Sequence, residues 1–153
     1  MEKDLKGKRI KTVKKSRRTE PRVIVFACIW HPYTAADNAG VGRFQYPPNA
    51  KIVGVNCVGT ITSAFVLRAF RNGADGVLVM GCGAGDCHYF NGNESCERVV
   101  QEAARILEVS GINAGRLGLE LSSEVDGEEF ASTVEGFIKK IRAMEGNGGR
   151  DAR

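Results

Sequence analysis

The sequence predicts a small α/β protein, built as a three-layer sandwich around a mainly parallel four-stranded sheet. Three observations indicate this class. Short apolar, β-branched runs alternate with amphipathic helical segments along the chain. The 153 residues suffice for one domain with one core, and 42% of them are hydrophobic, as in soluble globular proteins. No apolar run approaches the ~20 residues that a membrane-spanning helix needs.

The folded part begins with a strand over residues 23–27, whose continuous apolar run is typical of a strand buried on both faces. Thr34, with Asp37 three residues on, resembles a capping box and predicts a short helix that ends near residues 40–42. The prolines of residues 46–48 cannot lie inside a helix, so a loop follows.

Residues 51–56 then predict a second strand. Thr62 or Ser63 caps the next helix, which Gly73 ends. A third buried strand over residues 76–80 leads into a Gly-rich loop.

Beyond this loop, apolar residues at helical spacing predict a long amphipathic helix that ends at Gly111. Alternating leucines at residues 117–121 fit an edge strand, and residues 130–141 form a last amphipathic helix. Strands and helices thus alternate. Right-handed crossovers then favour the strand order 2-1-3-4, as in flavodoxin-like and Rossmann-like sheets. Sites in such sheets form beyond the carboxyl ends of the strands.

The charge is uneven along the chain. Residues 1–20 hold nine Lys/Arg and three Asp/Glu, while the other residues hold 13 and 15. We expect a flexible basic arm at residues 1–20, a folded domain at residues 21–145 and a flexible Gly-rich tail at residues 146–153. The arm suits docking on an acidic partner or plain solvation, and it has no aromatic residue to stack on nucleic-acid bases. Without an apolar segment at the N-terminus, a cytoplasmic protein is expected.

Cysteines follow the predicted strands at one edge of the sheet. Cys28 follows the first strand, Cys57 the second and Cys82 the third, while Cys87 lies in the Gly-rich loop. Neighbouring strands lie ~4.8 Å apart, so we expect these thiols to converge. Buried cysteine is common in strands, but three at equivalent places indicate a metal site. Cys96, at the start of a helix, is interpreted as structural.

Several neighbours of these cysteines fit the same interpretation. His31 follows the first cysteine at C-x-x-H spacing and is an alternate ligand or a near neighbour, and His88 directly follows the last. Gly83 and Gly85 allow the backbone to approach, and their N–H groups can hydrogen-bond cluster sulfides. Aromatic residues nearby would cover the site, face a partner or simply pack: Trp30, Tyr46 and Tyr89.

Four thiolates suit zinc or an iron–sulfur cluster equally well by ligand type. Structural zinc sites usually draw on tight C-x₂₋₄-C pairs, whereas these cysteines are spread over a domain able to fold alone. This favours a cluster, with structural zinc or scaffolding as the alternative. A thiol enzyme is less favoured, because no C-x-x-C pair, P-loop or dinucleotide motif is present. The odd total of five cysteines argues against a disulfide framework.

Four segments together resemble the delta (D) subunit family of methyl-viologen-reducing, F420-non-reducing hydrogenase. They are Val25-Phe26-Ala27-Cys28-x-Trp30, Tyr46-Pro47-Pro48-Asn49, the run from Phe65 to Val79, and Gly81-Cys82-x-x-Gly85-Asp86-Cys87-His88-Tyr89. The resemblance covers roughly residues 21–145.

The resemblance implies a [2Fe–2S] electron carrier in an anaerobe, with Cys28, Cys57, Cys82 and Cys87 at family cysteine positions. It implies a hetero-oligomer in which the chain relays electrons between a donor or acceptor enzyme and the FAD-containing A subunit of heterodisulfide reductase. Relatives also serve other electron-bifurcating assemblies, including benzoyl-CoA reductase complexes. This chain departs from the family at His31, where a cysteine is usual, and at residues 58–60, where the family usually reads Ser-Gly-Arg.

Overall fold

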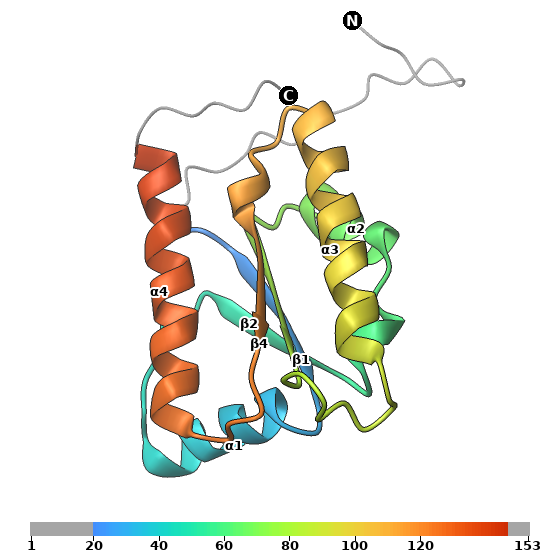
Figure 1. Ribbon diagram of the computed structural model, residues 1–153. Coiled ribbons are helices and arrows are strands. Elements are labelled where there is room, and N and C mark those ends of the chain that lie inside the picture. The colour runs from blue at the N-terminus through green and yellow to red at the C-terminus, as the bar shows by residue number, and fades with distance from the viewer. Residues whose placement is uncertain (1–19, 147–153) are drawn as a thin grey trace, which may run out of the picture.

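Four parallel strands form the central sheet in the order β2-β1-β3-β4 (Figure 1). They are β1 (Val23–Cys28), β2 (Ala50–Val55), β3 (Gly76–Gly81) and β4 (Leu117–Leu121). In this computed structural model, which describes residues 20–146, all three strand pairings are parallel. The predicted fold class and strand order are confirmed.

Helices cover both faces of the sheet (Figure 1). One face carries α1 (Pro32–Gly42) and α4 (Gly127–Gly146), and the other carries α2 (Ser63–Arg71) and α3 (Gly92–Val109). Two short 3₁₀ helices, η1 (Val58–Thr60) and η2 (Ala114–Arg116), were not predicted from the sequence. Each face encloses its own apolar core, which gives the three-layer arrangement.

The two central strands, β1 and β3, contribute buried side chains to both cores. Val25 and Leu78 are buried in the core beneath α1 and α4, whereas Val77 and Val79 are buried in the core beneath α2 and α3. Full burial of such a side chain stabilises the fold by ~1.5–3 kcal/mol. The middle of the sheet is therefore a stable base for the cysteine-bearing residues that follow the strand ends.

Helix boundaries agree with the predictions at most ends. The Thr62 hydroxyl accepts a hydrogen bond from the Phe65 N–H and so caps α2. Gly73, at φ +91°, follows the end of that helix. The capping box predicted at Thr34 is wrong. Because Pro32 has no N–H, it opens α1, and the Thr34 hydroxyl instead donates to the carbonyls of Ile29 and Trp30.

The predicted basic arm lies outside the described residues except for Glu20, which forms an ion pair with Arg142 of α4. The predicted tail also lies outside them, apart from Gly146. Within residues 20–146, no helix is both long and apolar enough to cross a membrane.

Candidate metal centre

Four thiols lie at the carboxyl edge of the sheet in two close pairs. The Sγ atoms of Cys28 and Cys82 are 3.6 Å apart, and those of Cys57 and Cys87 are 3.9 Å apart. Each pair joins residues far apart in the sequence, because the parallel strands bring their carboxyl ends to one edge. The predicted convergence of these cysteines therefore takes a specific form, two pairs drawn from three segments: the end of β1, the residues after β2 and the loop after β3.

The first pair is the more deeply buried. Cys28 is the last residue of β1, and Cys82 follows the end of the neighbouring strand β3. Both lie in the core beneath α2 and α3, with 1% and 2% of their surface exposed. Burial raises the pKa of Cys82 to about 12, and the hydrogen bond and charge of Cys28 contribute to the same rise. Without a cation nearby, the Cys82 thiol is therefore neutral at neutral pH.

Backbone N–H groups surround the second pair. The Gly59 N–H donates to the Cys57 sulfur at 3.4 Å, and the Gly92 N–H donates to the Cys87 sulfur at 3.2 Å. Burial raises the pKa of the Cys57 thiol. Burial also acts to raise that of Cys87, but N–H donors from Tyr89, Gly92 and Asn93 more than offset it, so the pKa of Cys87 is lowered. Cys87 is thus the thiol best prepared to carry negative charge.

Two glycines make the second pair possible. A Cβ on Gly92 would overlap the Cys57 sulfur and lie 3.2 Å from the Cys87 sulfur. A Cβ on Gly59 would lie 2.7 Å from the Cα of Gly92. The start of α3 therefore packs directly on η1, and only glycine fits at either position.

The loop that carries Cys82 and Cys87 is braced from two sides. The Gly83 N–H donates to the Ser123 hydroxyl at 3.0 Å, and the Gly83 carbonyl accepts from the Asn93 side chain at 2.8 Å. Asn93 is only 3% exposed. Sequence reasoning identified Gly83 but missed its two partners, because a single Asn or Ser carries no pattern that predicts such a contact.

Gly85 and His88 differ in their surroundings. Gly85 has φ +80° and open space where a side chain would be, so its role is to turn the loop. The His88 ring stacks on Trp30, with centroids 3.6 Å apart and an interplanar angle of 20°. The two predicted neighbours Trp30 and His88 thus contact each other, across the loops that follow Cys28 and Cys87.

His31 is the residue just before α1 and caps it without a side-chain hydrogen bond. Its Nδ1 atom is buried and has no hydrogen-bond partner among the described residues. No three His, Cys, Asp or Glu side chains in residues 20–146 gather closely enough to hold one metal ion, so His31 does not join a thiol pair in such a group.

Cys96 lies within α3, in the same apolar core as Cys28 and Cys82, and is fully buried. Burial raises its pKa to about 12, with a further contribution from the charge of Cys57. The sequence placed Cys96 away from the other thiols, but the structure brings it near Cys57. It still belongs to neither pair.

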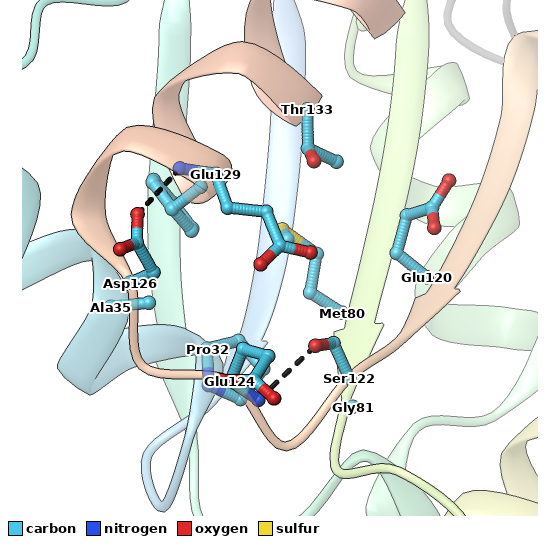
Figure 2. Close-up of a pocket in the computed structure, with 11 residues that line it drawn as sticks. Pro32, Ala35, Met80, Gly81, Glu120, Ser122, Glu124, Asp126, Glu129 and Thr133 are labelled. Atoms are coloured by element: carbon cyan, nitrogen blue, oxygen red, sulfur yellow. Dashed lines mark hydrogen bonds between the residues drawn. The ribbon is translucent and has the colours of Figure 1, made fainter.

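A pocket of about 40 Å³ lies at the same edge, on the α1 and α4 side of the sheet (Figure 2). Carboxylates surround it: Glu120, Glu124, Asp126 and Glu129. Asp126 accepts hydrogen bonds from the backbone of Glu128 and Glu129 and so caps the start of α4. This pocket adds carboxylates to the same edge of the sheet, and none of the cysteines is among the residues that line it.

The four paired thiols fit an iron–sulfur centre by their donor chemistry, since thiolate is the usual ligand of such clusters. The two pairs also act on each other. The charge of Cys28 raises the pKa of Cys57, and the charges of Cys87 and Cys57 raise that of Cys82, so the two pairs adjoin. Cations placed between these sulfurs would relieve that mutual repulsion.

Comparisons with known proteins identify a matching family and several relatives. The family described as "Methyl-viologen-reducing hydrogenase, delta subunit" matches residues 23–145. The iron-sulfur D subunit of the vhc F420-non-reducing hydrogenase of Methanococcus voltae is 44% identical over 82% of this chain and 87% of its own length. Its counterpart in Archaeoglobus profundus is 41% identical, over 84% of this chain and 94% of its own.

A third relative is much longer than this chain. The A subunit of the ferredoxin:CoB-CoM heterodisulfide reductase of Methanosarcina mazei is 36% identical over 81% of this chain, which corresponds to 16% of that protein.

The match to the family spans nearly the whole folded part and includes all four paired cysteines. The chain therefore belongs to the methyl-viologen-reducing hydrogenase delta-subunit family.

Proposed function

We propose that this protein is an electron-transfer subunit that carries one [2Fe–2S] cluster on Cys28, Cys57, Cys82 and Cys87. In this proposal it relays electrons between a donor oxidoreductase and the FAD-containing, heterodisulfide-reductase-A-like subunit of a flavin-bifurcating complex. Both the hydrogenase type and the benzoyl-CoA reductase type of complex are candidates. When bound, such a cluster supplies one-electron redox chemistry.

The observation that carries the proposal is the pairing of the thiols. For metal–sulfur bonds of ~2.3 Å, two ligands of one tetrahedral metal lie ~3.8 Å apart. The Cys28–Cys82 and Cys57–Cys87 separations, 3.6 and 3.9 Å, are close to this value. A single zinc ion would require all four sulfurs at this spacing, and no group of three occurs in the described residues. Two pairs favour two metal positions.

The protein contributes position, burial and hydrogen bonds. Buried Cys28 and Cys82 exclude water from one end of the site. N–H groups of Gly59 and Gly92 stabilise negative charge on the sulfurs at the other end. Hydrogen bonds to sulfur and solvent exposure are the factors by which a protein sets the reduction potential of such a centre.

Long relatives support the partner assignment. In the Methanosarcina mazei protein, a segment similar to this chain forms part of the heterodisulfide reductase A subunit itself. The corresponding A subunit of Methanosarcina acetivorans shows the same relationship, at 34% identity over 81% of this chain and 16% of its own length. Fusion within one polypeptide supports direct contact between the two parts where they are separate chains.

His31 is proposed as a neighbour of the centre, or as an alternate ligand. Four thiols already supply two ligands to each of two metals, and His31 lies at the start of α1. We expect the His31→Ala variant to retain its iron and its EPR g-values. A clear change in g-values with iron retained would instead assign His31 as a ligand.

The experiment that tests the function is the metal and sulfide content of anaerobically purified protein, followed by EPR after dithionite reduction. About two irons and two acid-labile sulfides per chain, with the signal of a reduced cluster, are expected. Zinc without sulfide would overturn the proposal in favour of the structural or scaffolding alternative. Protein without any metal would remove the electron-transfer role.

A further inference from the structure

Three aromatic side chains contact one another where the residues after Cys28 and Cys87 meet, and the exposed Phe90 follows them directly in the chain. We call Trp30, His88, Tyr89 and Phe90 the aromatic surface. Trp30 stacks on His88, and the Tyr89 ring meets both edge-on, with centroids 6.5 and 5.1 Å away. Trp30 is 41% exposed and Tyr89 is 52% exposed, so much of this apolar area faces water.

Phe90 is the most unusual member. It is 91% exposed and has φ +80°, in the left-handed region that residues other than glycine rarely adopt. Its N–H donates to the Cys87 carbonyl at 3.0 Å, and the Asn91 N–H donates to the Tyr89 carbonyl at 3.2 Å. A tight turn thus holds the ring in water. Neither the exposure nor the backbone conformation stabilises the isolated fold, and such strain is typical of functional sites.

Charge restricts the kind of partner that fits. Asp86 and Glu94, both exposed, stand within four residues of Phe90 in the sequence, on the loop and on α3. The carboxylates of the α1–α4 pocket lie at the same edge of the sheet. In a two-fold contact, a second copy of this chain would bring like charges face to face. A partner with basic side chains around an apolar centre is complementary.

We propose that the aromatic surface is the docking site for the heterodisulfide-reductase-A-like subunit with which this chain exchanges electrons. The proposal rests on the proposed function and names the contact through which it operates. The loop that carries Phe90 also carries Cys87, which is the least buried of the four paired thiols. The Phe90 and Tyr89 rings enter an apolar pocket on the partner. Lys or Arg side chains around that pocket face Asp86 and Glu94.

One other exposed apolar area serves as a comparison. A groove of about 260 Å³ lies between α2 and strands β1 and β2, with Phe65 and Val53 among its lining residues. Arg22 and Arg68 flank it, and it extends toward the amino end of β1, away from the thiols. Phe65 is 55% exposed, close to the value for Tyr89.

The test measures the affinity of cluster-loaded, full-length protein for the heterodisulfide reductase A subunit from the same organism. Test variants are Phe90→Asn, which tolerates the left-handed backbone, and Tyr89→Ser. Matched controls are Val109→Asn, at the same 91% exposure at the end of α3, and Phe65→Ser in the groove. Iron, sulfide and the EPR spectrum are measured on every variant.

We expect both test variants to bind about tenfold more weakly with unchanged iron content, while both controls bind like the original protein. The double variant Asp86→Asn/Glu94→Gln should reduce the salt dependence of the association rate. If Phe90→Asn binds with wild-type affinity, or if Phe65→Ser binds more weakly, the assignment of the aromatic surface as the docking site is wrong. If the cluster-loaded protein does not bind the reductase subunit, the choice of partner is wrong. If the purified protein holds no cluster, the proposed function is wrong instead.

Discussion

Gly92 and Cys57 are in such close contact that a Cβ on residue 92 would overlap the Cys57 sulfur. The two residues come from different segments, the start of α3 and the end of the loop after β2. This contact sets how near α3 comes to the second thiol pair. It also places the Gly92 N–H within 3.2 Å of the Cys87 sulfur.

The first prediction concerns Gly92→Ala. The added methyl group displaces Cys57, so we expect loss of iron and sulfide and a decrease of ~1–3 kcal/mol in the free energy of unfolding. Iron analysis and thermal unfolding check both effects. Gly136→Ala is the control, because nothing lies within 4 Å of a Cβ on Gly136 in α4. That variant should be stabilised by ~0.5–1 kcal/mol with full iron content. Equal iron loading of the two variants would contradict the packing argument.

The second prediction concerns Asn93→Leu. This change leaves the Gly83 carbonyl without its side-chain donor, and a buried unsatisfied group costs ~1–3 kcal/mol. The loop between Cys82 and Cys87 loosens, so the cluster should be lost faster in the presence of a chelator. Asn91→Ala is the control, since Asn91 is exposed and its side chain caps nothing. Chelation at the same rate in both variants would show that Asn93 does not hold this loop.

The third prediction separates Cys96 from the paired thiols. Cys96→Ala should keep its iron and sulfide and lose only ~1 kcal/mol of stability, typical of a buried substitution. Cys82→Ala should lose the cluster, because it removes half of the first pair. Metal analysis of the two variants side by side is the measurement. Substantial loss of iron from Cys96→Ala would show that the proposed ligand set is wrong.

The fourth prediction concerns the reduced, metal-free protein. The pKa of Cys87 is lowered, so its thiolate is present at lower pH than that of an ordinary cysteine. Burial raises the pKa of both Cys82 and Cys96 to about 12, so these two remain protonated at neutral pH. As the pH is raised in steps, iodoacetamide should therefore modify Cys87 before Cys82 and Cys96, as read by peptide mass spectrometry. Modification of Cys96 at the same pH would contradict this order.

Periodicity and turn residues were enough to predict the sheet, its strand order and the edge at which the cysteines meet. Val23–Cys28 is apolar throughout because both of its faces are covered, and a run of this kind predicts a central strand in any tertiary context. The handedness of crossovers then limits the order to few choices. These features depend on local sequence and general chain geometry, so they can be read without knowledge of the packing.

The division of the thiols into two pairs became visible in the folded structure alone. Strand-end positions place Cys28, Cys57 and Cys82 near one another, but the partners depend on distances of a few ångströms between loops. These distances follow from close contacts, such as Gly59 on Gly92 and Asn93 on Gly83, between residues with no shared sequence pattern. The periodicity of a sequence indicates which face of a helix or strand is buried. The spacing of the four sulfurs depends instead on how different helices, strands and loops pack together, which periodicity does not show.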